Sequence, residues 1–353
     1  MKFRPSANFE HKETNDFKAV PIKETPKNIR EKVERKEWRE IPITELVTRE
    51  PKSLEVIPNR FRPDSAMAWP AYYKTVKEEN EEDGRQKGLG ELAQTIEGEI
   101  QSSPFIKVRP EIKTRLDYAQ QILNQNPETM NFQLVVVDGY RRIDVQKKLF
   151  DAYLNHVREV NKDKKLSQEQ IMTMARKMVS EAPTDPEILQ KSPPPHSTGG
   201  AVDVVLVHKD KIDTTSDYWL QKAMIPFGAQ FDEMMNPVYH DKRSETVFYE
   251  KELTEKGSLE PEEQEALENR RILYHTLTGV GFSNYFTEFW HYDLGDQYNA
   301  VMSEKPSAEF GFAGGIEGDQ INEDLDAEKS AFAAYKTSHD SEEAERVRHH
   351  FGL

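Results

Sequence analysis

Residues 196–207 have the sequence HSTGGAVDVVLV, in which two glycines lead into a run of mostly β-branched residues. An apolar run bounded by turn residues predicts a strand at 201–207 that is buried on both faces. A second run, FQLVVV at 132–137, has the same character and follows an Asn-Pro pair. We therefore expect two strands, at 132–137 and at 201–207.

Helical patterns surround both strands. Apolar residues recur at helical spacing in segments that begin near residues 110, 143, 168 and 261. Ser167, with Gln170 three residues later, has the form of a capping box. The last of these segments should end at the glycines 279 and 281. A final strand is predicted over the aromatic residues 285–292. The pattern indicates an α+β fold, a small and mostly antiparallel sheet with flanking helices.

The ends of the chain have a different character. Residues 1–54 mix charges of both signs with scattered prolines and are expected to form an N-terminal extension, with a short helix possible around 28–40. Residues 55–315 should form the globular domain, and 316–353 an acidic C-terminal tail with a possible short helix near 342–348. The low mean hydropathy of −0.81 also indicates that part of the sequence lies outside the packed core.

Composition excludes several classes of protein. The 353 residues contain no cysteine, which rules out a disulfide scaffold and a zinc site built from thiolates. The net charge of −15 argues against a nucleic-acid partner, because such binding depends on neutralising phosphates. The sequence contains no run of about 18 apolar residues, so no membrane-spanning helix is predicted. The N-terminus has no apolar stretch of the kind a secretory signal needs, so a cytoplasmic location is expected.

The quoted stretch also carries groups suited to metal binding. His196 and Asp203 are seven residues apart, and the glycines between them allow the loop to fold back into the strand. An imidazole nitrogen and a carboxylate oxygen are both zinc ligands. Asp203 interrupts an apolar strand, and a buried carboxylate needs a partner or a metal. There are two alternatives. His196 and Asp203 could simply belong to a loop and turn, or Asp203 could form a salt bridge with an arginine.

A second group of candidates lies at 288–291, with the sequence EFWH. His291 could complete a three-ligand zinc site, and Glu288 could take a proton from a water in its open position. In a regular strand these two side chains would point to opposite faces, so the hypothesis requires a bulge or a bend. The alternative is an aromatic strand at the edge of the core, with Phe289 and Trp290 packed inside and Glu288 in solvent.

A third candidate is the stretch Tyr140-Arg141-Arg142, in the sequence DGYRR that follows the strand at 132–137. Functional side chains are often presented on such loops. A guanidinium could stabilise a carbonyl oxygen as it becomes an oxyanion. The alternative is a surface pair, Arg141 and Arg142, at the start of a helix.

Together these motifs resemble the D-alanyl-D-alanine dipeptidase family of zinc peptidases, which includes the vancomycin-resistance dipeptidases. Four blocks match in order over roughly residues 55–315, namely DGYRR at 138–142, HSTGGAVD at 196–203, FGAQFDEM at 227–234 and EFWHYDLGDQ at 288–297. Pro194 and Arg142 stand where the family often has serine and proline.

The resemblance implies hydrolysis of D-alanyl-D-alanine with one zinc ion per chain. It implies that the zinc ligands are His196, Asp203 and His291. It also implies that Glu288 is the general acid/base and that Arg141 stabilises the tetrahedral intermediate. Asp232 is expected to meet the substrate ammonium, and Tyr140 and Trp290 to contact the substrate.

Two other functions remain open at this point. One is a related peptidoglycan D,D- or L,D-carboxypeptidase or endopeptidase, which would use the same zinc site on larger substrates. The other is a catalytically inactive, zinc-stabilised binding module. The expected partner is a small dipeptide, with neither nucleic acid nor membrane, and the sequence does not indicate an oligomeric state.

Overall fold

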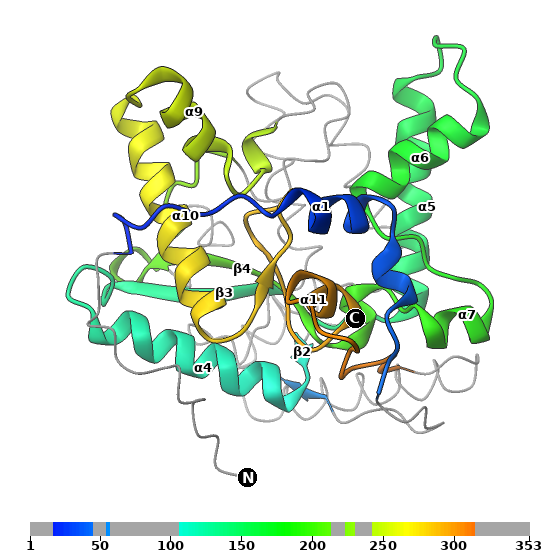
Figure 1. Cartoon of the computed structure of the whole chain (residues 1–353), viewed down its shortest axis with the longest axis horizontal. Coiled ribbons are helices and arrows are strands. Elements are labelled where there is room, and N and C mark those ends of the chain that lie inside the picture. The colour runs from blue at the N-terminus through cyan, green and yellow to red at the C-terminus, as the bar shows by residue number, and fades with distance from the viewer. Residues whose placement is uncertain (1–16, 45–53, 57–105, 213–222, 230–241, 315–353) are drawn as a thin grey trace, which may run out of the picture.

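The computed structural model describes residues 17–44, 54–56, 106–212, 223–229 and 242–314. At its centre is a four-stranded antiparallel sheet with the order β3-β4-β6-β5 (Figure 1). The strands are β3 (Phe132–Asp138), β4 (Ala201–His208), β5 (Ser283–Asn284) and β6 (His291–Asp293). Helices flank this small sheet, so the predicted α+β fold class is confirmed.

The two central strands are those that the apolar runs predict. β4 pairs with β3 on one side and β6 on the other, and every residue from 201 to 207 is buried. Opposed positions carry apolar residues, such as Leu134 opposite Leu206 and Val135 opposite Val205. β-Branched and other apolar side chains suit such a doubly covered strand. The register shifts between Val136 and Asp138, which is a bulge at the end of β3.

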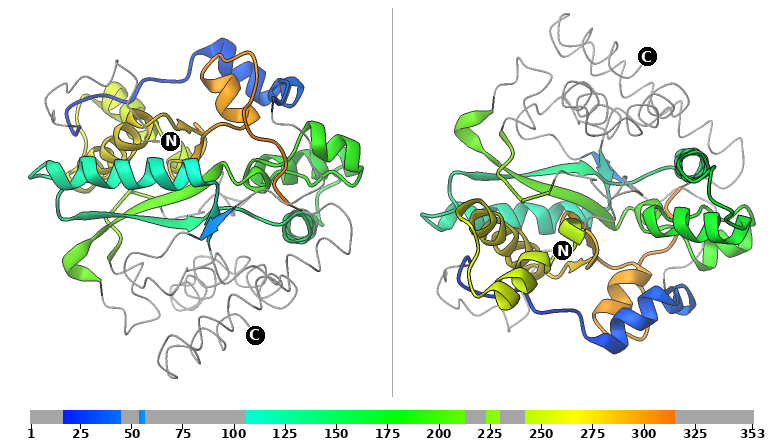
Figure 2. Two further views of the ribbon diagram at one scale, coloured as in Figure 1. Left: turned by 90° about the horizontal axis from the view of Figure 1, so that it is seen from below. Right: turned by 90° about the horizontal axis from the view of Figure 1, so that it is seen from above.

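Two helices cover the same side of this sheet, as Figure 2 shows. They are α4 (Pro110–Gln125) and α10 (Pro261–Gly279), and each has proline in its first turn, where no intrahelical donor is lost. Ile112, Leu116, Ile272 and Leu273 contribute to one hydrophobic core with the strands. The core therefore lies between these helices and the sheet.

A helical hairpin forms one end of the molecule (Figure 1). It consists of α5 (Ile143–Val160) and α6 (Gln168–Met178), which share their own apolar cluster. The capping box predicted at the start of α6 is confirmed, since Ser167 Oγ accepts from the Gln170 amide and Gln170 Oε1 accepts from the Ser167 amide. The remaining elements are β1 (Glu55–Val56), β2 (Lys107–Val108), α7 (Pro186–Lys191), η2 (Pro195–Thr198), η3 (Lys209–Lys211), η5 (Lys242–Ser244), α9 (Phe248–Lys256) and α11 (Gln297–Met302).

The continuous strand predicted over 285–292 is wrong. Residues 285–290 form a hairpin loop between β5 and β6, which the Tyr285 amide closes by donating to the His291 carbonyl at 3.0 Å. Phe289 and Trp290 are buried within this loop, and the Phe289 ring stacks on Phe227 with centroids 4.8 Å apart. The aromatic residues that suggested a strand are thus buried without an extended backbone.

The N-terminal segment 17–44 runs over the surface of the globular part and includes α1 (Lys27–Glu34) and η1 (Glu37–Glu40) (Figure 1). The helix predicted near 28–40 is therefore confirmed. The helix predicted near 342–348 lies outside the described residues. None of the helices in the described part has the length and apolar character needed to cross a membrane.

Candidate active site

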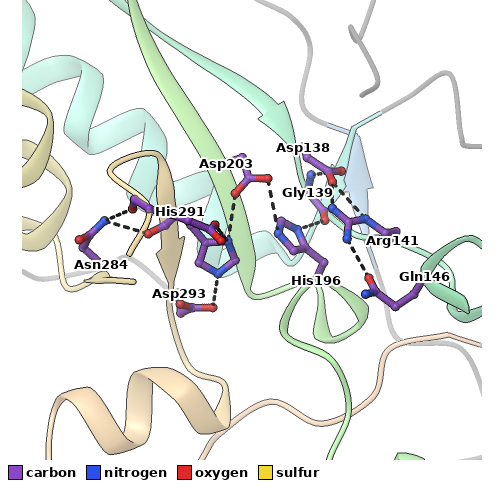
Figure 3. A network of polar contacts seen from close by, with 10 residues as sticks. Asp138, Gly139, Arg141, Gln146, His196, Asp203, Asn284, His291 and Asp293 are labelled. Atoms are coloured by element: carbon purple, nitrogen blue, oxygen red, sulfur yellow. Dashed lines mark hydrogen bonds and ion pairs between the residues drawn. The ribbon is translucent and has the colours of Figure 1, made fainter. Parts of the chain in front are cut away.

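Three side chains from separate elements converge at one end of the sheet (Figure 3). His196 comes from η2, Asp203 from β4 and His291 from β6, and a ligand atom of each lies within 4.8 Å of the others. The antiparallel register places Asp203 directly opposite His291. All three are buried, so the arrangement is a compact set of two imidazoles and one carboxylate.

His196 is held in a defined tautomer. Its Nδ1 lies 2.8 Å from the Gly139 carbonyl oxygen, which can only accept, so Nδ1 carries the proton. Nε2 faces Asp203 Oδ2 at 3.6 Å, beyond hydrogen-bond distance. Burial lowers the pKa of His196 to about 3, against the opposing effect of Asp203. The ring is therefore neutral near neutral pH, with its Nε2 lone pair directed at the cluster, as a metal ligand requires.

His291 lies between two carboxylates. Its Nδ1 is 3.0 Å from Asp203 Oδ1, and its Nε2 is 3.1 Å from Asp293 Oδ1. Burial opposes protonation, but Asp293 and Asp203 outweigh it and raise the pKa of His291 well above its usual value. The two buried carboxylates thus favour a positive charge between them. A divalent cation supplies such a charge, so the donor set fits a metal ion.

Glu288 lies beside this set because the hairpin loop bends back before β6. Glu288 Oε2 is 3.7 Å from His291 Nδ1, although the two residues are three apart in sequence. In a regular strand the side chains of Glu288 and His291 would point to opposite faces, and the loop allows both to face the cluster. Burial raises the pKa of Glu288 to about 7, partly opposed by His291. A carboxylate with such a pKa can both take up and release a proton near neutral pH.

Arg141 is fixed at the other side of the cluster. Its Nη2 pairs with Asp138, and Nη1 donates to Gln146 Oε1 at 2.8 Å (Figure 3). The bulge at the end of β3 sets Asp138 opposite Asp203, so the arginine lies next to the carboxylate of the cluster. Burial lowers the pKa of Arg141, but Asp138 outweighs it and raises the pKa above its usual value. The guanidinium therefore stays charged.

These groups open onto a cavity of about 960 Å³. Arg141, His196, Asp203, Glu288 and His291 all line it, together with Trp290, which is 2% exposed.

Two further residues, Tyr140 and Asp232, were predicted to contact the substrate. Tyr140 is absent from the described cavity lining, and a methyl group on Gly314 would collide with its hydroxyl. Asp232 lies outside the described residues. Substrate contact by Tyr140 and Asp232 stays a prediction.

Four supporting residues were not identified from the sequence. Asp138 holds Arg141, the Gly139 carbonyl orients His196, and Asp293 binds the far nitrogen of His291. The Asn284 amide donates to the carbonyls of Glu288 and His291, which fixes the hairpin loop. Asp293 could have been found, because it lies two residues beyond His291 and a strand places such residues on one face.

Gly139 offers a test of this support. A Cβ atom at Gly139 would lie 2.7 Å from the Lys107 carbonyl oxygen and 2.9 Å from Ile106 Cγ2, so Gly139→Ala must displace the loop that orients His196. We expect Gly139→Ala to weaken zinc affinity by about 10- to 100-fold, the usual cost of disturbing an outer-sphere partner. Competition with a chelating dye measures this affinity.

The matched control is Gly279→Ala, whose Cβ would meet nothing within 4 Å. It should bind zinc as the unaltered protein does. Equal affinities for the two variants would show that the Gly139 carbonyl does not position His196.

Comparisons with known proteins point in one direction. A family model described as D-ala-D-ala dipeptidase matches residues 85–308. A D-alanyl-D-alanine dipeptidase from Synechocystis sp. is 28% identical over 201 residues, which cover 55% of this chain and 71% of that protein. The matched region includes all three residues of the cluster as well as Arg141 and Glu288.

Proposed function

The chain belongs to the D-Ala-D-Ala dipeptidase family, and from this premise we propose that it is a zinc peptidase that hydrolyses D-alanyl-D-alanine to D-alanine. The observation that carries the proposal is the convergence of His196, Asp203 and His291 beside the carboxylate of Glu288. A purely structural metal site would need no such carboxylate.

His196 Nε2, Asp203 and His291 would hold one zinc ion per chain. Nitrogen and oxygen donors suit zinc, and three protein ligands leave a position for water, as in catalytic sites. A zinc ion there would make a bound water more acidic and polarise the substrate carbonyl. Asp293 would keep the ring of His291 in place through Nε2.

Glu288 is the proposed general acid/base. Its half-buried carboxylate lies beside the cluster and lines the cavity, so it can accept the proton of the attacking water. The same carboxyl group then donates that proton to the nitrogen of the departing D-alanine. Both transfers use one side chain, because the water and the leaving group meet at the same carbon.

Arg141 is the proposed stabiliser of the negative charge that develops on the carbonyl oxygen. Asp138 and Gln146 fix its guanidinium in the cavity wall, so it needs little reorganisation during the reaction. Trp290 would contribute an apolar surface for the substrate, while Tyr140 and Asp232 are proposed as further contacts. We also propose that the catalytic domain extends over residues 55–315.

A carboxypeptidase that removes the last residue of longer peptides is the second candidate. The cavity of about 960 Å³ favours it, since such a volume is near the upper end of the range for drug-sized ligands and exceeds the needs of a dipeptide.

One panel of substrates tests both functions. We expect zinc-loaded protein to release D-alanine from D-alanyl-D-alanine and to lose this activity when a chelator is added. L,D- and L,L-dipeptides and an N-acylated D-alanyl-D-alanine complete the panel. Faster turnover of the acylated peptide would favour the carboxypeptidase. Stoichiometric zinc with no hydrolysis of any member would contradict both and favour a binding module.

A further inference from the structure

The N-terminal segment is part of the cavity wall, although it precedes the region 85–308 that matches the family. Figure 2 shows α1 lying beside α11, and the two elements share a hydrophobic cluster. The buried members of that cluster are Ile29, Val33, Trp38, Phe286, Tyr298 and Val301. Since apolar contacts anchor the segment, the position of its polar residues is set by packing.

A chain of aromatic rings connects this segment to the candidate metal site. Ring centroids are 6.3 Å apart between Trp38 and Tyr298, 5.1 Å between Tyr298 and Tyr285, and 5.8 Å between Tyr285 and His291. Each pair is in an edge-to-face arrangement, which is a favourable geometry for aromatic rings. The segment thus borders the same space as His291.

Two cations of the segment, Lys36 and Arg39, line the cavity. Within the described part of the chain neither forms an ion pair, and the buried Nε of Arg39 has no hydrogen-bond partner. Neighbouring cations do have glutamate partners, in the pairs Lys27–Glu31, Arg30–Glu24 and Arg35–Glu31. Burial and the nearby Arg39 and Arg176 lower the pKa of Lys36 to about 8, partly opposed by Glu181. Glu181 acts on both cations, but it is already bound by Arg176, so neither Lys36 nor Arg39 has an ion-pair partner among the described residues.

An uncompensated, partly buried cation is costly, and a carboxylate is the natural counter-ion. A guanidinium with a buried, unpaired N–H is also preorganised to bind one. Arg176, on the same wall, already has such a partner, because its Nε donates to Glu181 Oε2 at 2.7 Å. Lys36 and Arg39 therefore remain available to an incoming anion on this wall.

We propose that Lys36 and Arg39 form a subsite that binds the free C-terminal carboxylate of the peptide substrate. This inference rests on the proposed function, since it assumes that a peptide enters the cavity. It assigns to the N-terminal segment the selection of substrates with a free carboxyl end. The two cations act on binding, because they are separate from the groups that handle the proton.

The test compares D-alanyl-D-alanine with its C-terminal amide in the full-length, zinc-loaded protein. We expect the double variant Lys36→Gln/Arg39→Gln to lose about ten- to hundredfold in kcat/KM on the free acid, mainly through KM, the range for a charged hydrogen bond. Turnover of the amide should stay unchanged, which also shows that the variant is folded. Arg39→Lys should recover part of the preference for the acid.

Lys32→Gln/Arg35→Gln is the matched control, because both residues belong to the same segment, are exposed and lie away from the cavity lining. It should behave as the unaltered protein. Equal losses on acid and amide, or no loss on the acid, would overturn the subsite.

The proposed function can fail separately. If the unaltered protein hydrolyses neither compound, calorimetric titration with the acid and the amide still tests the subsite. Tighter binding of the acid, lost in Lys36→Gln/Arg39→Gln, supports the subsite although the peptidase proposal has failed. Equal binding of the two compounds, or no binding of the acid, overturns it.

Discussion

Glu288→Ala is expected to lower kcat by about two to four powers of ten or more while zinc binding is retained. The carboxylate is the only group in our proposal that takes the proton from water and returns it to the leaving amine. Its Oε2 lies 3.7 Å from His291 Nδ1 and it is not one of the three proposed ligands, so its removal leaves them in place. Steady-state rates on D-alanyl-D-alanine and metal analysis of the same sample measure the two effects.

Glu34→Gln provides the matched control for charge. Glu34 lines the same cavity from α1 but is exposed and away from the cluster, so its variant should retain full activity. Glu288→Gln should be as slow as the alanine variant, because an amide cannot accept the proton. Turnover of either Glu288 variant at the rate of the unaltered protein would remove Glu288 from the mechanism.

His291→Ala should abolish stoichiometric zinc binding and, with it, hydrolysis. The variant removes one of three proposed ligands and leaves Asp203 and Asp293 as buried carboxylates without the imidazole between them. The loss of affinity should therefore exceed the about 10- to 100-fold that disturbing an outer-sphere partner costs. Metal analysis after dialysis against buffer with a weak chelator measures retention.

Two comparisons separate loss of a ligand from loss of the fold. His208→Ala removes an imidazole from the far end of β4, where the ring contacts Phe132, and should keep its zinc. His196→Ala should lose zinc as His291→Ala does. Thermal unfolding in the absence of metal shows whether each variant is folded. A folded His291→Ala protein with one zinc ion per chain would show that another residue is the ligand.

The sequence predicted those elements whose local signals agree with their tertiary surroundings. β4 and β3 are apolar runs between turn residues, and α6 begins at a capping box whose two hydrogen bonds are present. The loop at 285–290 was mistaken for a strand because burial of Phe289 and Trp290 gives the same composition in either conformation. Only long-range contacts, such as that of Phe289 with Phe227, distinguish the two.

The central residues of the candidate site were predicted from the sequence, but the residues that hold them in place were not. His196, Asp203 and His291 come together as the motifs suggested. The roles of Gly139 and Asn284 could not be predicted, because they act through a backbone carbonyl and through a loop that was taken for a strand. The contribution of the N-terminal segment to the cavity wall was also not predicted from the sequence. Its anchors, Ile29, Val33 and Trp38, are few and lie within a strongly charged segment.

The row formed by Asp138, Asp203 and His291 across three adjacent strands has a consequence for folding as well. Because β4 has apolar side chains on both faces, a shift of one residue against a neighbouring strand would still bury apolar residues. Apolar contacts alone therefore specify the register poorly. After such a slip Asp203 would be opposite Tyr292, an aromatic neighbour that cannot neutralise it. The ionisable groups of the candidate site would then also specify the register of the sheet. A sheet paired in the wrong register would be less stable, whether or not substrate is bound.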